Sequence, residues 1–151
     1  DMATFKNLKE LNKALQQYVQ SALENEVAEA VKDEMVDQID EVVYAAYTPY
    51  NLAGTDHHYH RTYKLKDRDS MKSTMPNNNT LEVENIREGA ETVITGVGYT
   101  WGKNSGYVRD LDTEIGARDF IQATRDGLEE NKVHVKALKD ALKKKGIRVE
   151  D

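Results

Sequence analysis

Residues 7–46 read NLKELNKALQQYVQSALENEVAEAVKDEMVDQIDEVVYAA, and this stretch decides the fold. Its apolar residues recur at steps of three and four, and the first 46 residues contain neither proline nor glycine. Both features predict one long amphipathic α-helix. Asn7 and Glu10 can begin it with a capping box, and Thr4 is the other candidate cap. At about 1.5 Å per residue, such a helix would be about 60 Å long. We therefore expect it to bend, to break near residues 21–25, or to project toward a partner.

The middle of the chain predicts an arm and a small sheet. Residues 50–79 are expected to form an extended loop or arm, because they combine histidines, mixed charges and a turn-rich MPNNN at their end. Alternation over residues 59–65 favours a short strand within it. Residues 81–86 and the alternating residues 93–101 predict antiparallel strands joined by a turn at 87–90. Gly96 and Gly98 leave one strand face nearly bare, which indicates close approach of another backbone or of a helix.

The last helical region is expected to begin at Arg118, with an irregularity at residues 127–132. It ends in the sequence KKKGI, where the lysines complement the helix dipole and Gly146 suits a left-handed cap. The expected fold is α+β, in one domain over residues 1–151. It comprises a long N-terminal amphipathic helix, a small antiparallel sheet with a long loop or arm at 50–79, and a C-terminal helix.

The composition excludes several classes of function. The chain has 151 residues, a formal net charge of −6 and no cysteine. The acidic balance argues against general affinity for nucleic acid, which depends on Lys and Arg neutralising phosphates. The absence of cysteine excludes thiol catalysis, thiolate metal sites and disulfides. No apolar run approaches the roughly 20 residues of a membrane span, so we expect no membrane partner and no secretory signal.

One cluster could carry metal chemistry. Asp56, His57, His58 and His60 offer three imidazoles and a carboxylate within five residues. The histidines contain no i, i+4 pair, and no second ligand cluster stands out, so a solvated loop is the alternative interpretation. A metal-dependent hydrolase using His57, His58 and His60 remains a hypothesis. The serines and glycines show no nucleophile or phosphate-binding signature, and we expect a non-enzymatic protein without cofactor or resident metal.

Two single-sign stripes suggest surfaces for assembly. Both follow helical steps of three and four. The acidic stripe comprises Glu26, Glu29, Asp33, Asp37 and Asp40, and the lysine stripe comprises Lys132, Lys136, Lys139 and Lys143. Three interpretations stay open: both are solvated faces; the acidic stripe meets the lysine stripe, within a subunit or between neighbours; or the acidic stripe lines a channel through which DNA moves.

Tyrosines bracket the arm. Tyr47 and Tyr59, together with Tyr44, Tyr50 and Tyr63, lie at its two ends, and Arg61 is nearby. Tyrosine and arginine are typical anchors of protein–protein interfaces. Ordinary packing of the arm onto the domain is the alternative.

Several motifs together resemble a known family. These are the helix that runs into residues 42–49 (VVYAAYTP), residues 59–65 (YHRTYKL), and the aromatic-ended strand near Trp101. A helix start at residues 117–124 (ARDFIQAT) and a helix end at residues 142–147 (LKKKGI) complete the pattern. In this order and spacing the chain resembles the small minor structural proteins of the tailed-phage head–tail joint, of siphophage type, called neck or tail-completion proteins. In that family the position of Asp119 is commonly proline, and aspartate is a reasonable first-turn substitute.

The resemblance implies an α+β virion subunit that forms a homo-oligomeric ring in the phage neck. Such a ring, a hexamer or dodecamer, would join the head connector or adaptor to the tail-terminator or tail-tube proteins. Its lumen would let genomic DNA pass without sequence recognition. The expected location is the virion, after assembly in the cytoplasm of the bacterial host. A helical cytoplasmic adaptor without a phage context is the alternative from another class.

Overall fold

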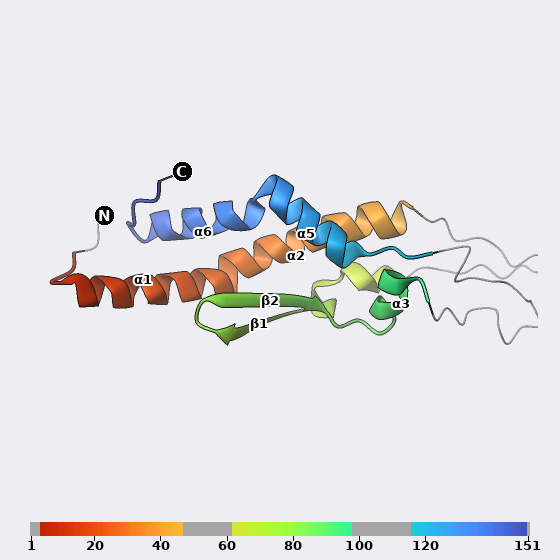
Figure 1. Cartoon of the computed structure of the whole chain (residues 1–151), viewed down its shortest axis with the longest axis horizontal. Helices are drawn as coiled ribbons and strands as arrows, with labels where there is room; N and C mark the ends of the chain where they lie inside the picture. Colours follow the sequence, from red (N-terminus) through yellow and green to blue (C-terminus); the bar gives the residue numbers. More distant parts are fainter. Residues whose placement is uncertain (1–3, 47–61, 98–115, 151) are drawn as a thin grey trace, which may run out of the picture.

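One continuous helix organises the protein. The computed structural model describes residues 4–46, 62–97 and 116–150. The helix comprises α1 (Leu8–Ala22), a π-helical turn η1 (Leu23–Val27), α2 (Ala28–Gln38) and a second π-helical turn η2 (Ile39–Tyr44). In Figure 1 the β-hairpin lies below this helix and the C-terminal helices lie above it. The predicted α+β class and the long N-terminal helix are confirmed.

The ends and the bend of the long helix follow from local chemistry. The Asn7 side chain accepts a hydrogen bond from the Glu10 backbone N–H (2.9 Å). The Glu10 carboxylate accepts one from the backbone N–H of Lys6 (3.1 Å), one residue before the cap itself. The helix changes direction where α1 meets α2 (Figure 1), at the turn η1, and π-helical turns are a usual cause of such bends. Of the three expected outcomes for this helix, the bend is therefore confirmed, whereas the break expected near residues 21–25 is wrong, because the helix continues through η1 into α2.

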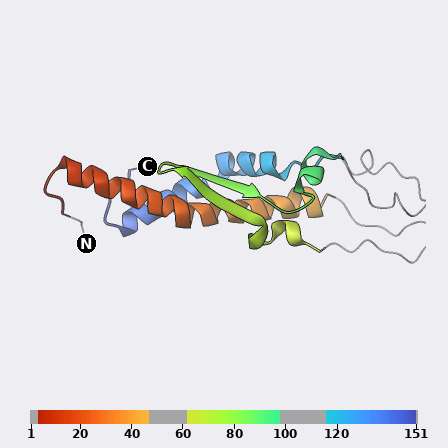
Figure 2. The same ribbon diagram turned by 90° about the horizontal axis from the view of Figure 1, so that it is seen from below.

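The small sheet is a two-stranded hairpin. Strand β1 (Met71–Asn77) pairs antiparallel with β2 (Thr80–Asn85), with Met71 opposite Asn85 and Asn77 opposite Thr80. Two short 3₁₀ turns, η3 (Lys64–Lys66) and η4 (Arg68–Ser70), lead into it. Figure 2 shows the hairpin lying across the long helix.

The predicted arm at residues 50–79 is wrong for its second half, which contains η3, η4 and β1. The strand expected over residues 59–65 is likewise wrong for its described part, which enters η3. Pro76 argued for a loop, but among the described residues β1 pairs only with β2, and Pro76 lies in the register irregularity between Thr74 and Asn77. Proline is tolerated at edge strands and at bulges.

The strand predicted over residues 93–101 is also wrong where it is described. Residues Ala90–Thr95 form the short helix α3, between Gly89 and Gly96, whose φ angles are +87° and +73°. The turn expected at 87–90 therefore leads into a helix. A Cβ placed on Gly96 would lie 2.4 Å from the backbone nitrogen of Ala117. The predicted close approach of another backbone is confirmed at Gly96, whereas Gly98 lies outside the described residues.

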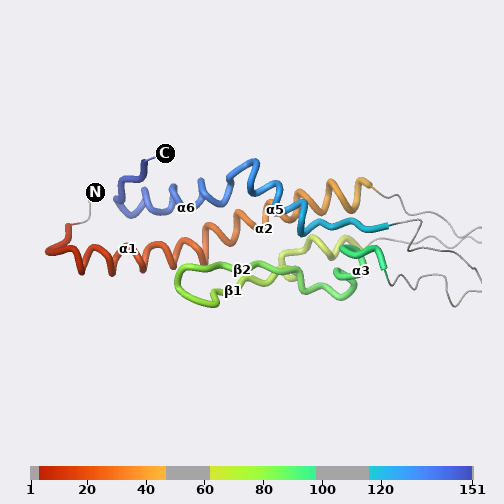
Figure 3. Tube along the Cα trace, viewed as in Figure 1, coloured from red at the N-terminus to blue at the C-terminus, as the bar shows by residue number. Residues whose placement is uncertain are grey.

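Two C-terminal helices run back along the long helix (Figure 3). Helix α5 (Phe120–Asn131) begins where Asp119 accepts a hydrogen bond from the Gln122 N–H (2.9 Å). Lys132, with φ +55°, separates it from α6 (Val133–Lys144), which confirms the predicted irregularity. At the end of α6 the N–H of Ile147 donates to Leu142 O and that of Gly146 to Lys143 O. These two bonds form a Schellman motif around the left-handed Gly146.

The apolar core lies under the second half of the long helix. A single cluster of buried side chains joins this half to the start of β1, to α3 and to the start of α5: Met35, Ile39, Val43, Met71, Ala90 and Phe120. The backbone N–H of Arg118 donates to Val93 O (2.9 Å) and closes the cluster at one end. Helix α1 contributes only Ala22 to the buried residues. The first half of the long helix thus lies outside the core.

A buried carboxylate marks the crossing of α2 and α5. Glu34 is only 6% exposed, and its Oε1 accepts hydrogen bonds from Gln38 Nε2 (3.1 Å) and Asn131 Nδ2 (3.3 Å). A Cβ on Gly127 would lie 2.0 Å from that same oxygen. Gly127 therefore makes room for the carboxylate. Hydrogen bonding is required here because an unpaired buried charge is costly.

Gly127→Ala is expected to lower the free energy of unfolding by about 1–3 kcal/mol, the usual cost of overpacking. At an open helical site the same substitution would raise it by about 1 kcal/mol. Urea denaturation of wild type and variant measures the difference in free energy of unfolding. In a Glu34→Ala background the nearest obstacle is gone, and only the flexible end of Gln38, whose Nε2 lies 2.9 Å from the position of the new Cβ, has to move. Gly127→Ala is expected to be neutral or stabilising in that background. Stabilisation in the wild-type background would contradict this packing.

Candidate assembly surfaces

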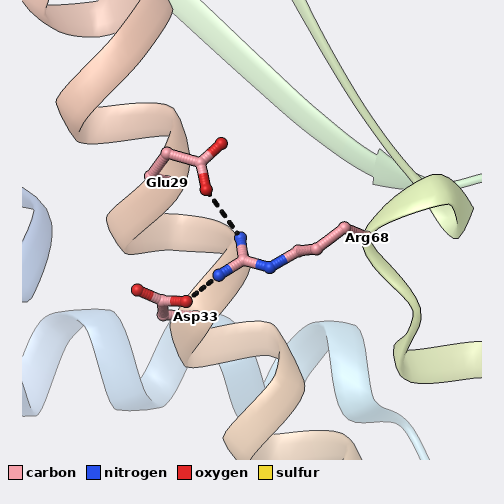
Figure 4. A network of polar contacts seen from close by, with 3 residues as sticks. All are labelled: Glu29, Asp33 and Arg68. Carbon is pink, nitrogen blue, oxygen red and sulfur yellow. Dashed lines mark hydrogen bonds and ion pairs between the residues drawn. The ribbon is translucent and has the colours of Figure 1, made fainter.

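The acidic stripe finds partners on the segment that precedes the hairpin. Arg68 contacts two of its members: Nη1 lies 3.2 Å from Glu29 Oε2, and Nη2 pairs with Asp33 Oδ1 (Figure 4). Lys66 Nζ lies 2.8 Å from Asp40 Oδ1. The hydrogen bond to Asp40 raises the pKa of Lys66. These contacts attach the 3₁₀ turns η3 and η4 to the exposed side of the long helix.

This pairing corrects one of the three interpretations of the stripes. Within the described part of the chain, Glu29, Asp33 and Asp40 pair with Lys66 and Arg68 and not with the lysine stripe. The sequence contained a signal for this pairing, because Lys64, Lys66 and Arg68 place a basic residue at every second position of the segment before the hairpin. Glu26 and Asp37 are exposed on the same helix. Contact between the stripes of neighbouring subunits remains a prediction.

The lysine stripe lies along the start and the length of α6. Lys132, Lys136 and Lys143 are exposed, and Lys139 is half-buried. Lys136 Nζ pairs with Asp140 Oδ2 one turn later (2.6 Å), and this hydrogen bond lowers the pKa of Asp140. The stripe is therefore a largely exposed basic surface.

An aromatic contact lies at the end where η2, η3, α3 and the start of α5 meet (Figure 3). The rings of Tyr44 and Tyr63 are 4.9 Å apart in an edge arrangement. Lys66 Nζ lies 5.7 Å and 5.9 Å from their centroids, within the range of a cation–π interaction. Burial raises the pKa of Tyr44. Two of the five tyrosines expected at the base of the arm, Tyr44 and Tyr63, thus pack on each other.

Several predicted site residues lie outside the described part of the chain: Tyr47, Tyr59, Arg61, His57, His58 and His60. Close to where the first described range ends and the last one begins, Arg118 Nη1 donates a hydrogen bond to Val43 O (3.2 Å). Among the described residues, no group of three or more His, Asp and Glu side chains could hold a metal ion. None of the described helices is long and apolar enough to cross a membrane.

An apolar groove with a volume of about 330 Å³ opens beside the long helix. One face of the long N-terminal helix forms its floor, and β2 and α5 form its walls. The lining residues are Leu23, Val27, Val31, Met35, Leu81, Val83, Ile121, Thr124, Arg125, Leu128 and His134. Leu23, Val31, Leu81 and Leu128 are only half-buried. Sequence patterns did not reveal this groove, because it depends on how β2 and α5 are placed around the helix.

His134 at the edge of this groove has an unusual environment. Its Nδ1 atom is buried and has no hydrogen-bond partner among the described residues. Burial lowers the pKa of His134, and the nearby charge of Lys132 lowers it further. The folded state therefore favours the neutral imidazole.

Arg68→Gln is expected to lower the free energy of unfolding by no more than about 1 kcal/mol at low salt, because its side chain and those of Glu29 and Asp33 are 42%, 63% and 67% exposed. At about 1 M salt, where the screening length falls to about 3 Å, the difference should disappear. Urea denaturation at the two salt concentrations measures it. Arg87→Gln, at an exposed arginine outside this cluster, serves as the control. A loss that persists at high salt would contradict an electrostatic role.

Stability is expected to fall as the pH drops below about 6.5, the usual pKa of histidine. In that range the unfolded state binds a proton at His134 that the folded state binds less readily, so protonation favours unfolding. Thermal unfolding of wild type and His134→Gln between pH 7.5 and 5.5 measures the effect. The variant should lose less stability over this interval than wild type. An equal loss in both proteins would exclude His134 as a source of the pH dependence.

Comparison with known proteins gives a family and nothing beyond it. A family model described as YomN matches residues 7–144, from the capping Asn7 to the last residue of α6. No curated protein and no solved structure matches the chain. The match covers the long helix, the hairpin and both C-terminal helices. The chain belongs to the YomN family.

Proposed function

We propose that the chain is a non-enzymatic structural subunit that forms a homo-oligomeric ring in the neck of a tailed phage. In this role it joins the head connector to the tail and lines the passage for DNA. The observation that carries the proposal is the incomplete cover of the long helix. A subunit made to pack against copies of itself leaves apolar surface that only assembly buries.

The distribution of buried residues supports this role. The core cluster is confined to the second half of the long helix, together with β1, α3 and α5. Helix α1 is strongly amphipathic in sequence, yet Ala22 alone of its residues is buried. A monomer gains little from such a helix, because isolated helical turns depend on tertiary packing for most of their stability. A neighbouring subunit would supply that packing.

The charges support the proposed DNA passage. The formal net charge is −6, and the exposed Glu26 and Asp37 lie on the outer side of the long helix. A surface of this sign repels phosphates and gives none of the attraction on which stable DNA binding depends. DNA that must slide through a ring benefits from such a surface. The resemblance of residues 42–49 and 117–124 to phage neck proteins points to the same passage.

The proposal is tested by the mass and shape of the purified protein. Light scattering coupled to gel filtration should give a multiple of the 17.2 kDa chain mass, six or twelve chains for a hexamer or dodecamer, and electron microscopy should show rings with a lumen. If the free chain assembles only on a template, isolated phage connectors or tails should bind several copies in a ring. A protein that stays monomeric alone and with these phage parts would contradict the proposal. A one-to-one complex with a partner helix would favour the adaptor instead.

A further inference from the structure

We propose that the first turns of α1 of one copy occupy the apolar groove of the next copy. This inference rests on the proposed ring and names the contact that builds it. Two features of the same chain carry it: an amphipathic helix end that the described residues leave exposed, and an apolar groove that no described residue fills. The occupant is a second copy of this chain.

The uncovered end of α1 is the donor. Leu8 is 75% exposed, and Leu11 and Leu15 on the same stripe are only half-buried. The C-terminal helix α6 packs along α1, and Lys145 at its end lies 5.8 Å from the ring of Tyr18. The first turns of α1 extend beyond the end of α6 (Figure 1). They present a leucine stripe that the described part of the same chain does not bury.

The groove is the acceptor. Its floor begins at Leu23, directly after α1 ends, and continues through Val31 on the same helix. Because the helix is continuous from Leu8 to Tyr44, α1 cannot fold back into the groove of its own chain without breaking. The leucine stripe must come from another chain. The half-buried Leu81 and Leu128 on the two walls are matched to such a stripe.

Charge favours this pairing. The N-terminal end of the helix is basic, since between residues 4 and 13 the three lysines Lys6, Lys9 and Lys13 are accompanied by one carboxylate, Glu10. The elements around the groove are acidic. Glu29 and Asp33 are already paired with Arg68, and Glu34 is buried. The other carboxylates of residues 23–38, β2 and α5 are Glu24, Glu26, Asp37, Glu82, Glu84, Asp126, Glu129 and Glu130, against Lys32 and Arg125. Opposite charges on two surfaces direct association and fix its register.

The geometry of the contact leads to a ring. The donor surface and the acceptor surface are two different parts of the chain, so the contact is heterologous. Each subunit in such an arrangement offers a free donor on one side and a free acceptor on the other. Repetition of the contact closes into a ring when its rotation permits. The proposed function and the proposed contact therefore require the same type of interface.

The contact is tested by disabling the donor and the acceptor separately. Leu8→Glu removes the apolar donor at an exposed position, and Leu81→Glu places a charge in the groove. Each variant alone should lose the rings of wild type and run as a monomer of 17.2 kDa in light scattering. Mixed in equal amounts, the two should form a dimer of twice that mass and nothing larger, because one supplies an intact groove and the other an intact α1.

Controls separate assembly from folding. Ile86→Glu makes the same kind of change at a residue that is 55% exposed and lies outside both surfaces, and it should leave the rings intact. Thermal unfolding of each variant checks that the fold is kept. If Leu81→Glu lowers the melting temperature, Arg125→Trp replaces it, because Arg125 is exposed at the groove and a large ring there blocks entry.

The outcomes distinguish a failure of the proposed contact from a failure of the proposed ring. Wild-type rings that survive both Leu8→Glu and a groove variant overturn the contact and leave the proposed function standing. Loss of rings with the groove variant but not with Leu8→Glu would mean that another segment fills the groove, and overturns the contact as well. A wild-type chain that forms no ring under any condition overturns both. Mutual rescue into a dimer supports both.

Discussion

The packing of one helix determines the rest of the structure. At about 1.5 Å per residue, the helix from Leu8 to Tyr44 is about 55 Å long, which is more than the remaining described elements cover. The core cluster covers the second half of this helix, where Ile39 is fully buried together with Phe120 of α5. The first half meets α6 only in part, and Leu8 stays exposed. Continuity of the helix is what keeps its apolar N-terminal stripe away from the groove that the same helix helps to form.

Polar contacts fix the elements around this helix in different ways. At the α2–α5 crossing, the buried Glu34 and the missing side chain at Gly127 set how closely the two helices approach. On the exposed side, Arg68 and Lys66 hold the turns before the hairpin against the acidic stripe. The first contact is buried, and its loss is costly. The second set of contacts is solvent-exposed, so it adds little to the free energy of folding and mainly positions the turns on the helix. Together they place β2 and α5 on either side of the groove.

The features that could be predicted from the sequence are those that local interactions along the chain determine. The helical period, the Asn7 cap, the irregularity at 127–132 and the Gly146 end were all readable, because each depends on neighbours in the chain. Tertiary context decided the rest. The alternating residues of α3 favoured a strand, but the helix is held by the bond from Arg118 to Val93 and by the contact of Ala117 with Gly96. The stripes were visible, but the partner of the acidic stripe depends on where the 3₁₀ turns dock. The groove had no local signature at all.

The central claim is that another copy covers the first turns of the long helix, and the absence of cysteine from the chain permits a direct measurement. A protein with Leu8→Cys is mixed with a protein with Leu81→Cys under mild oxidation, and the products are separated by mass without reductant. The account predicts a disulfide-linked heterodimer that forms faster than either homodimer, and a ladder of linked chains when both substitutions are in one protein. Homodimers alone, or no linked product under conditions in which the wild-type chain assembles, would contradict it.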